Sequence, residues 1–194
     1  MWILCCGPKR SGSTLQFNIV RQILEETDSG FAIDYTFPDD FPRVLEVNEE
    51  KTGYKLFKTH ELTPTMLDLV KRNQAVCISC YRDIRDVAVS IGKKESIDPD
   101  TIAQNPNFIK NYISYEKKVR SLKGSYISKY EKFYNDIYIE GRNIAKFLSV
   151  EISDKSLRRI EDELSFKNRS QLADISEMID FKGRNNKYYK INKE

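Results

Sequence analysis

The stretch GPKRSGST, residues 7–14, lies between a short apolar run and a segment with helical periodicity. The apolar run, residues 2–6, predicts a strand, and Leu15, Ile19 and Ile23 then recur at the spacing of one buried helix face. A strand, a tight glycine turn and a helix bring backbone N–H groups and the positive end of a helix dipole around an anion. The stretch therefore predicts an α/β fold that begins with a phosphate-binding turn.

The same turn is similar to the nucleotide-binding P-loop, G-x-x-x-x-G-K-[ST], but Ser13 stands in the lysine position. In nucleoside triphosphatases that lysine reaches the β- and γ-phosphates, and the following hydroxyl holds magnesium. No clear acidic residue closes an apolar strand to anchor magnesium. The turn fits a single phosphate better than a triphosphate, although a glycine turn alone is equally compatible with an ordinary strand-to-helix connection.

Composition narrows the function classes. The chain has 194 residues and is 40% hydrophobic, so we expect a single domain over residues 1–194 with one sizeable core. A net charge of +3 is too small to indicate nucleic-acid binding. The apolar start is too short for a membrane span or a signal peptide, and we predict a cytoplasmic protein. The basic tail, residues 182–194, is either solvated or closes over an anion.

Strand and helix patterns alternate along the chain. Further strands are predicted at residues 54–58, 75–81 and 126–130. Further helices are predicted near residues 64–71, from 84, over 110–122, up to 148 and around 157–164. Residues 31–48, rich in aromatic residues, acids and proline, are predicted to be irregular. The alternation predicts one three-layer α/β domain with a mostly parallel central sheet flanked by helices, and ligands at the carboxyl ends of its strands.

The cysteines are predicted to be reduced and buried. Cys77 and Cys80 have the spacing of a zinc or redox pair, but they lie inside the strand-like run AVCISCY. Residues three apart in a strand point to opposite faces of the sheet. We therefore predict structural thiols here and no metal site.

Two further polar blocks follow predicted strands. Lys58 and His60 lie on one side of the second strand's end, where a base beside a cation suits transfer of an anionic group to a hydroxyl. His60 is the only histidine of the chain, and a lone histidine can also be structural. Arg82 and Ser90 follow the third strand, where they either grip a second phosphate or belong to an ordinary amphipathic helix capped by Asp83.

In their order, these blocks resemble those of sulfotransferases that use 3'-phosphoadenosine-5'-phosphosulfate (PAPS), and the resemblance spans about residues 6–148. Residues 10–14, RSGST, are similar to the family's 5'-phosphosulfate loop, and residues 58–60, KTH, to the segment with its catalytic base. Residues 82–90, RDIRDVAVS, are similar to its 3'-phosphate motif and are the most specific match. Residues 129–131, KYE, are similar to the segment whose tyrosine lies near the adenine.

The resemblance implies sulfuryl transfer from PAPS to a hydroxyl of a small-molecule or glycan acceptor, with 3',5'-adenosine bisphosphate (PAP) as the product. PAPS has no γ-phosphate and requires no magnesium, which agrees with the missing P-loop lysine. The implied catalytic residues are His60 as general base, with Lys58 and Arg10 stabilising developing charge. The implied PAPS contacts are Lys9, Arg10, Ser11, Gly12, Ser13, Thr14, Arg82, Ser90, Tyr130 and, in a late loop, Lys182, Gly183 and Arg184.

The chain also departs from the family pattern. Lys9 replaces a common proline, Leu15 replaces a common adenine-stacking tryptophan, and no aspartate follows Glu131. Two other classes stay open, a P-loop kinase of small metabolites and a catalytically silent nucleotide-binding protein. The sequence leaves sugar, lipid, phenol and peptide acceptors open, with residues 31–41 and 93–112 as candidate acceptor walls or lids or as plain surface loops.

Overall fold

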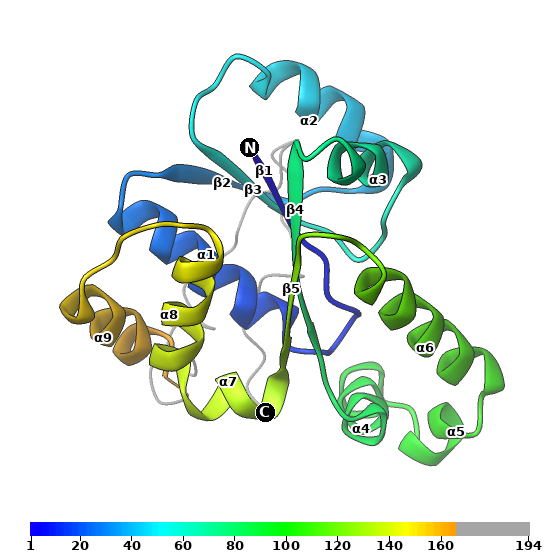
Figure 1. Cartoon of the computed structure of the whole chain (residues 1–194). Helices are drawn as coiled ribbons and strands as arrows, with labels where there is room; N and C mark the ends of the chain where they lie inside the picture. The colour runs from blue at the N-terminus through cyan, green and yellow to red at the C-terminus, as the bar shows by residue number, and fades with distance from the viewer. Residues whose placement is uncertain (166–194) are drawn as a thin grey trace.

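Within residues 1–165, which the computed structural model describes, five strands form a central sheet (Figure 1). They are β1 (Trp2–Cys5), β2 (Gly30–Tyr35), β3 (Tyr54–Lys58), β4 (Ala75–Tyr81) and β5 (Ser125–Lys129). Their order across the sheet is β2-β3-β1-β4-β5, and each neighbouring pair is parallel. The carboxyl ends of all five strands therefore meet at one edge, where ligands of open α/β sheets bind.

Helices cover both faces of the sheet (Figure 1). The helices are α1 (Ser13–Glu26), η1 (Pro38–Asp40), α2 (Phe41–Asn48), α3 (Pro64–Lys71), α4 (Ile84–Glu95), α5 (Pro99–Ala103), α6 (Pro106–Arg120), α7 (Tyr130–Asn135), α8 (Ile137–Phe147) and α9 (Asp154–Glu163). α1, α8 and α9 pack on one face, and α2, α3 and α6 pack on the other. The predicted three-layer α/β architecture is confirmed.

Alternation along the strands divides the core into two clusters. Ile3 and Ile78 face the α1 side, whereas Leu4 and Phe57 face the α3 side, and all four are fully buried. Burying apolar surface yields roughly 25 cal/mol per Å², so these two clusters are the main stabilising contribution to the fold. They hold the strand ends, and hence the loops beyond them, in a fixed arrangement.

The cysteines follow the same alternation. Cys5 and Cys80 lie in the cluster on the α1 side, and Cys6 and Cys77 lie in the cluster on the α3 side. All four are free and buried. The prediction that Cys77 and Cys80 point to opposite faces is confirmed.

The segment predicted to be irregular, residues 31–48, is in fact mostly ordered, and that prediction is wrong. It contains most of β2, η1 and α2. β2 is an edge strand whose pairing shifts register between Ala32 and Tyr35, and Asp34 has a left-handed φ of 65°. The bulge breaks the apolar alternation by which a strand is recognised in sequence.

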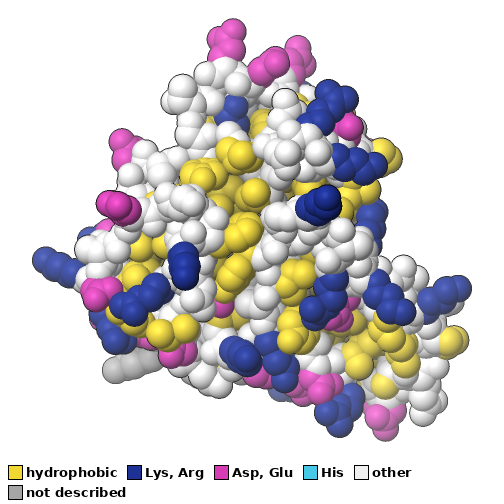
Figure 2. All heavy atoms as spheres, in the orientation of Figure 1, with side chains coloured by type: hydrophobic (Ala, Val, Ile, Leu, Met, Phe, Trp, Pro, Cys, Tyr) yellow, Lys and Arg dark blue, Asp and Glu magenta, His cyan; other side chains and the backbone are white. Residues whose placement is uncertain are grey.

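Two surface features complete the description. In Figure 2 the basic side chains are scattered among acidic ones, and they form no single patch on the visible face of the described residues. Every helix within residues 1–165 is too short or too polar to serve as a membrane span.

Candidate active site

Two left-handed residues shape the turn between β1 and α1. Arg10 has φ 64°, and Gly12, which precedes the first residue of α1, has φ 92°. A Cβ atom on Gly12 would lie 2.1 Å from Cδ2 of Tyr130, so only glycine fits against that ring. No side chain of the described residues caps α1, and the N–H groups of its first turn are left for an anion.

Two backbone carbonyl oxygens of this loop accept hydrogen bonds from side chains. Ser11 Oγ donates to the carbonyl oxygen of Pro8 at 2.7 Å, and Cys80 Sγ donates to the carbonyl oxygen of Ser11 at 3.2 Å. Burial raises the pKa of the Cys80 thiol, which keeps its hydrogen available for donation. Because these two carbonyl oxygens already accept hydrogen bonds, they repel an anion in the loop less, and the backbone N–H groups are available to bind it.

His60, just beyond the end of β3, is bonded to the same loop. Its Nδ1 lies 2.8 Å from the carbonyl oxygen of Gly7, which can only accept, so Nδ1 carries the ring hydrogen and Nε2 keeps a lone pair. Burial, followed by the positive charge of Lys58, lowers the pKa of His60 to about 3. The ring is neutral at physiological pH, and its Nε2 can accept a proton.

Lys58 ends β3 and reaches the first turn of α1. Its Nζ donates to Thr14 Oγ1 at 3.0 Å, and the residue is only 1% exposed. Burial lowers the pKa of Lys58 to about 8, so its ammonium group keeps a proton at neutral pH. In such a buried position a positive charge stabilises a nearby anion more strongly than it would at the surface.

Arg82 follows β4 and carries an unused donor. Its guanidinium Cζ lies 4.6 Å from the centre of the Tyr130 ring. Arg82 Nε is buried and has no hydrogen-bond partner in the described part of the chain. A buried donor without an acceptor costs about 1–3 kcal/mol or more, so this nitrogen is a natural position for an acceptor group of a ligand.

Side chains join the glycine loop, residues 7–12, to the block after β4, residues 82–90. Arg10 Nε donates to Ser90 Oγ at 2.8 Å, and Ser90 is buried in the second turn of α4. Asp83 caps α4 by accepting a hydrogen bond from the backbone N–H of Arg85 at 2.9 Å, as the alternative interpretation of this block as an ordinary capped helix expected. The two predicted phosphate-binding blocks are therefore neighbours at one edge of the sheet.

The structure brings together the predicted site residues of the first 165 positions around the ends of β1, β3, β4 and β5. Ser11 and Ser13 are buried in the loop, and Lys9 is exposed at its outer side. The remaining predicted contacts, Lys182, Gly183 and Arg184, lie outside the described residues.

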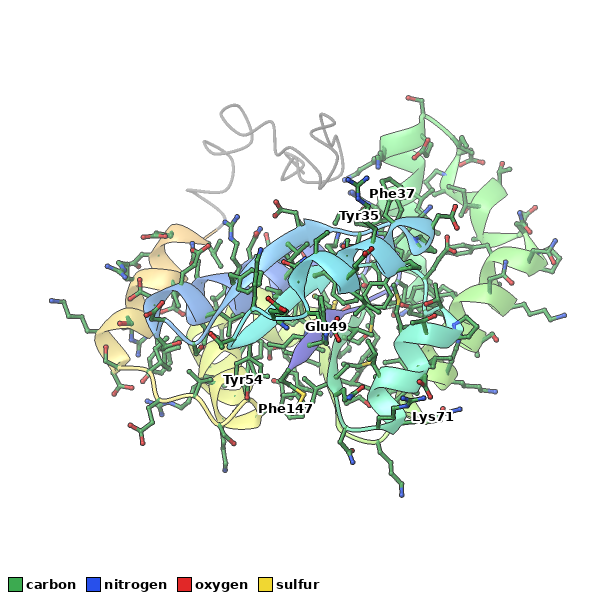
Figure 3. The ribbon with its side chains drawn as sticks, turned by 90° about the horizontal axis from the view of Figure 1, so that it is seen from above. Tyr35, Phe37, Glu49, Tyr54, Lys71 and Phe147 are labelled. Carbon is green, nitrogen blue, oxygen red and sulfur yellow. The ribbon has the colours of Figure 1, made fainter. Side chains whose placement is uncertain are left out.

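The sequence predicted Tyr35 only as part of a candidate acceptor wall, residues 31–41, and missed it as a neighbour of His60. The Tyr35 ring centre lies 5.7 Å from that of His60 and 4.8 Å from that of Phe37, which places two aromatic rings beside the histidine. Figure 3 shows Tyr35 and Phe37 next to one another, whereas Tyr54 begins β3 and lies at the other end of the β2–β3 pair. The cluster of aromatic residues in residues 31–41 was the available signal, since it predicted an acceptor wall.

Gln16 is a second residue that was missed. Its Nε2 donates to Ser128 Oγ at 2.7 Å and to the carbonyl oxygen of Ser79 at 3.1 Å. These bonds connect α1 to β4 and β5 beneath the glycine loop. A glutamine in an amphipathic helix normally indicates an exposed position, so its sequence gave no signal of this role.

Comparison with known proteins gives a family and a fold. The sulfotransferase domain family matches residues 2–187. Mouse sulfotransferase SULT7A1, crystallised with PAP, is similar with a TM-score of 0.67 and 15% identity over 100% of this chain and 73% of that one. Retinol dehydratase, crystallised with androsterone and inactive cofactor PAP, is similar with a TM-score of 0.53 and 17% identity over 87% of this chain.

This chain spans 65% of the retinol dehydratase chain. A sulfotransferase from Alicyclobacillus acidocaldarius has a TM-score of 0.53 and 11% identity over 89% of this chain and 94% of that one. No curated protein sequence matches. At these identities the solved structures establish a shared fold.

Proposed function

The chain belongs to the sulfotransferase domain family, and from this premise we propose that it transfers a sulfuryl group from PAPS to a hydroxyl group of a small-molecule or glycan acceptor. The observation that carries the proposal is a neutral histidine, His60, bonded directly to an anion-binding loop, together with a buried donor beyond the end of β4, Arg82 Nε, that has no partner within residues 1–165. The match over residues 2–187 also supports one domain for residues 1–194.

The two donor regions fit a nucleotide with two separate phosphate groups. The first-turn amides of α1, with the hydroxyls of Ser13 and Thr14, suit the 5'-phosphate. Arg82 and Ser90 suit the 3'-phosphate, since a guanidinium binds phosphate through strong charge-assisted hydrogen bonds. PAP carries phosphates at both positions, and two of the similar structures were crystallised with it.

Tyr130 lies between the two regions. One side of its ring contacts Gly12, and Arg82 stacks on the ring. A nucleoside that joins the two phosphates has to pass close to this tyrosine. The position supports the proposed contact between Tyr130 and the adenosine portion of the ligand.

His60 is proposed to act as the general base. Its Nε2 takes the proton of the acceptor hydroxyl while Nδ1–H holds the ring on the Gly7 carbonyl. A positioned base of this kind contributes on the order of 10²–10⁴ in rate. Bound PAPS would supply the activated sulfuryl group.

Lys58 and Arg10 are proposed to stabilise the negative charge that develops on the transferred group and on the departing phosphate. Lys58 is held by its hydrogen bond to Thr14, and Arg10 by its hydrogen bond to Ser90. Donors held in place in advance lower the barrier because they need little reorganisation during the reaction. No step in this scheme requires a metal ion.

A binding and turnover panel tests the proposal. PAP without magnesium should stabilise the protein by about 2.7 kcal/mol at 100 times its Kd, and more strongly than AMP at equal concentration. The same preparation should release PAP from PAPS in the presence of a suitable hydroxylated acceptor. Equal stabilisation by AMP and PAP would contradict the two-phosphate assignment.

Two further outcomes would favour a different function. Selective stabilisation by ATP with magnesium would favour a small-molecule kinase. PAP binding without transfer to any of a panel of phenols, sterols, sugars and peptides would favour a silent nucleotide-binding protein.

A further inference from the structure

Helix α6 presents two tyrosine hydroxyls to the backbone of the site. Tyr112 and Tyr115 are three residues apart, so they lie one above the other on the same face of the helix. The Tyr112 hydroxyl donates to the carbonyl oxygen of Arg82 at 3.0 Å and accepts from the backbone N–H of Arg82 at 3.1 Å. The Tyr115 hydroxyl donates to the carbonyl oxygen of Cys6 at 2.5 Å.

These two backbone positions are the starting points of the two anion-binding regions. Cys6 directly precedes Gly7, whose carbonyl oxygen orients His60, and the glycine loop follows. Arg82 carries the unpaired donor of the second region. One turn of α6 thus contacts both the backbone position that precedes the glycine loop and the first residue of the block after β4.

Both tyrosine hydroxyls remain protonated, so both can keep donating their hydrogen bonds. Tyr112 is 8% exposed and uses its hydroxyl as donor and as acceptor, so neither capacity is left unsatisfied. Burial raises the pKa of Tyr112 to about 12 and that of Tyr115 higher still, so both hydroxyls remain protonated at any physiological pH. A helix is stiff over one turn, which fixes the distance between the two hydroxyls.

We propose that Tyr112 and Tyr115 are positioning residues that set the separation of the two anion-binding regions and thereby select an adenosine bisphosphate with the 3',5' arrangement. This inference rests on the proposed function, because it assigns one phosphate to each region. Neither tyrosine needs to touch the ligand. Each acts through a backbone position, Tyr112 through Arg82 and Tyr115 through Cys6 and Gly7.

The test removes one hydroxyl at a time. Tyr112→Phe and Tyr115→Phe keep the ring and lose the hydrogen bond, and Tyr54→Phe is the matched control. The Tyr54 hydroxyl donates to the carbonyl oxygen of Leu148 at 2.6 Å, remote from the site. Each protein is assayed for Tm, for the Kd values of 3',5'-PAP, 2',5'-adenosine bisphosphate and AMP, and for turnover with PAPS.

The expected results differ among the three variants. Tyr112→Phe should raise the Kd of 3',5'-PAP about tenfold and the Kd of AMP by less than about twofold. The ratio of the Kd of 2',5'-adenosine bisphosphate to that of 3',5'-PAP should therefore move towards one. Tyr115→Phe should weaken PAP and AMP alike, by roughly three- to tenfold, and should also lower kcat because Gly7 orients His60. Tyr54→Phe should lower Tm by a similar amount and leave every Kd unchanged.

A merely structural role gives a different pattern. The inference is overturned if Tyr112→Phe lowers Tm as Tyr54→Phe does with the ratio between the two bisphosphates unchanged, and Tyr115→Phe lowers Tm with the Kd of PAP and kcat unchanged. Should Tyr112→Phe fail to fold, the Kd values of PAP and AMP and the kcat of Tyr115→Phe decide between a positioning role and a merely structural one. A wild-type protein that does not prefer PAP over AMP refutes the proposed function, whereas a wild-type preference that survives both variants refutes only the positioning role.

Discussion

The glycine loop and the block after β4 are suited to bind anions by different means. The loop offers backbone amides, with the carbonyl oxygens of Pro8 and Ser11 hydrogen-bonded into the protein. The block after β4 offers side chains, Arg82 with its unpaired Nε and Ser90 beside Arg10. Backbone amides accommodate any phosphate, whereas a placed guanidinium requires an anion at one particular point.

The difference separates two kinds of task. His60 is bonded to the loop and Lys58 to the first turn of α1, so the proposed reacting centre lies on the loop side. Arg82 lies away from the reacting centre and suits a phosphate that does not react. Changes on the loop side should therefore affect turnover, and changes after β4 should affect nucleotide selectivity.

The largest effect is expected on the loop side. His60→Ala should lower kcat for sulfuryl transfer by about 10²–10⁴, because it removes the proton acceptor, while the Kd of PAP stays within about twofold. The measurement is PAP release from PAPS together with a PAP titration. His60→Gln keeps a donor near the Gly7 carbonyl but no base. If this variant retained full turnover, proton acceptance would not be the role of His60.

Arg82→Ala tests the other region. The variant should weaken PAP by roughly 1.5–3 kcal/mol, about 10- to 150-fold, because a charged hydrogen-bond donor is lost, and it should leave AMP nearly unchanged. Arg85→Ala is the matched control, since Arg85 is exposed and paired with Asp83. Calorimetric titration with both nucleotides measures the difference. Equal losses for AMP and PAP would place Arg82 on the 5'-phosphate instead.

The pH dependence of kcat/KM should be asymmetric. Because the pKa of His60 is lowered to about 3, the base is already unprotonated at pH 5, and no acid limb is expected near pH 6.5. Because the pKa of Lys58 is lowered to about 8, its charge is lost above that pH, and the rate should fall by up to about tenfold per pH unit.

Lys58→Arg provides the control, since arginine stays charged at alkaline pH. In this variant the basic limb should move upward or disappear. A basic limb near pH 8 that survives the substitution would have to come from another group.

The smallest effect is expected at Lys9. This residue is exposed, so Lys9→Ala should weaken PAP by no more than about 1 kcal/mol, and the difference should vanish at high salt. Titrations at low and high ionic strength measure it. A large effect that persists in salt would show that Lys9 binds the ligand directly.

Much of the fold could be predicted because β1 and β4 are nearly continuous apolar runs and strand and helix patterns alternate along the chain. The bounds of β3, α3 and β4 agree with the prediction, and β5 begins one residue earlier. β2 could not be recognised because it is a half-buried edge strand interrupted at Asp34. α2 has a proline as its second residue and follows aromatic and acidic residues, which are also typical of loops.

The local parts of the candidate site were predictable for a similar reason. His60 and Arg82 follow strands, and parallel strands bring their ends together whatever lies between them. Cys80, Tyr112 and Tyr115 were not predictable because their roles depend on hydrogen bonds to backbone atoms far away in the chain. Such contacts leave no periodicity or motif in a single sequence.

The bond between His60 Nδ1 and the Gly7 carbonyl makes the chemistry of the ring conditional on the shape of the loop. If the loop tilts that carbonyl away, the imidazole is free to place its hydrogen on Nε2, and the protein then has a histidine in the right place that cannot act as a base. A substitution in the loop can therefore inactivate the protein while every catalytic side chain is present. Loss of turnover in a loop variant should be interpreted together with the tautomer of His60, which the nitrogen chemical shifts of the ring report.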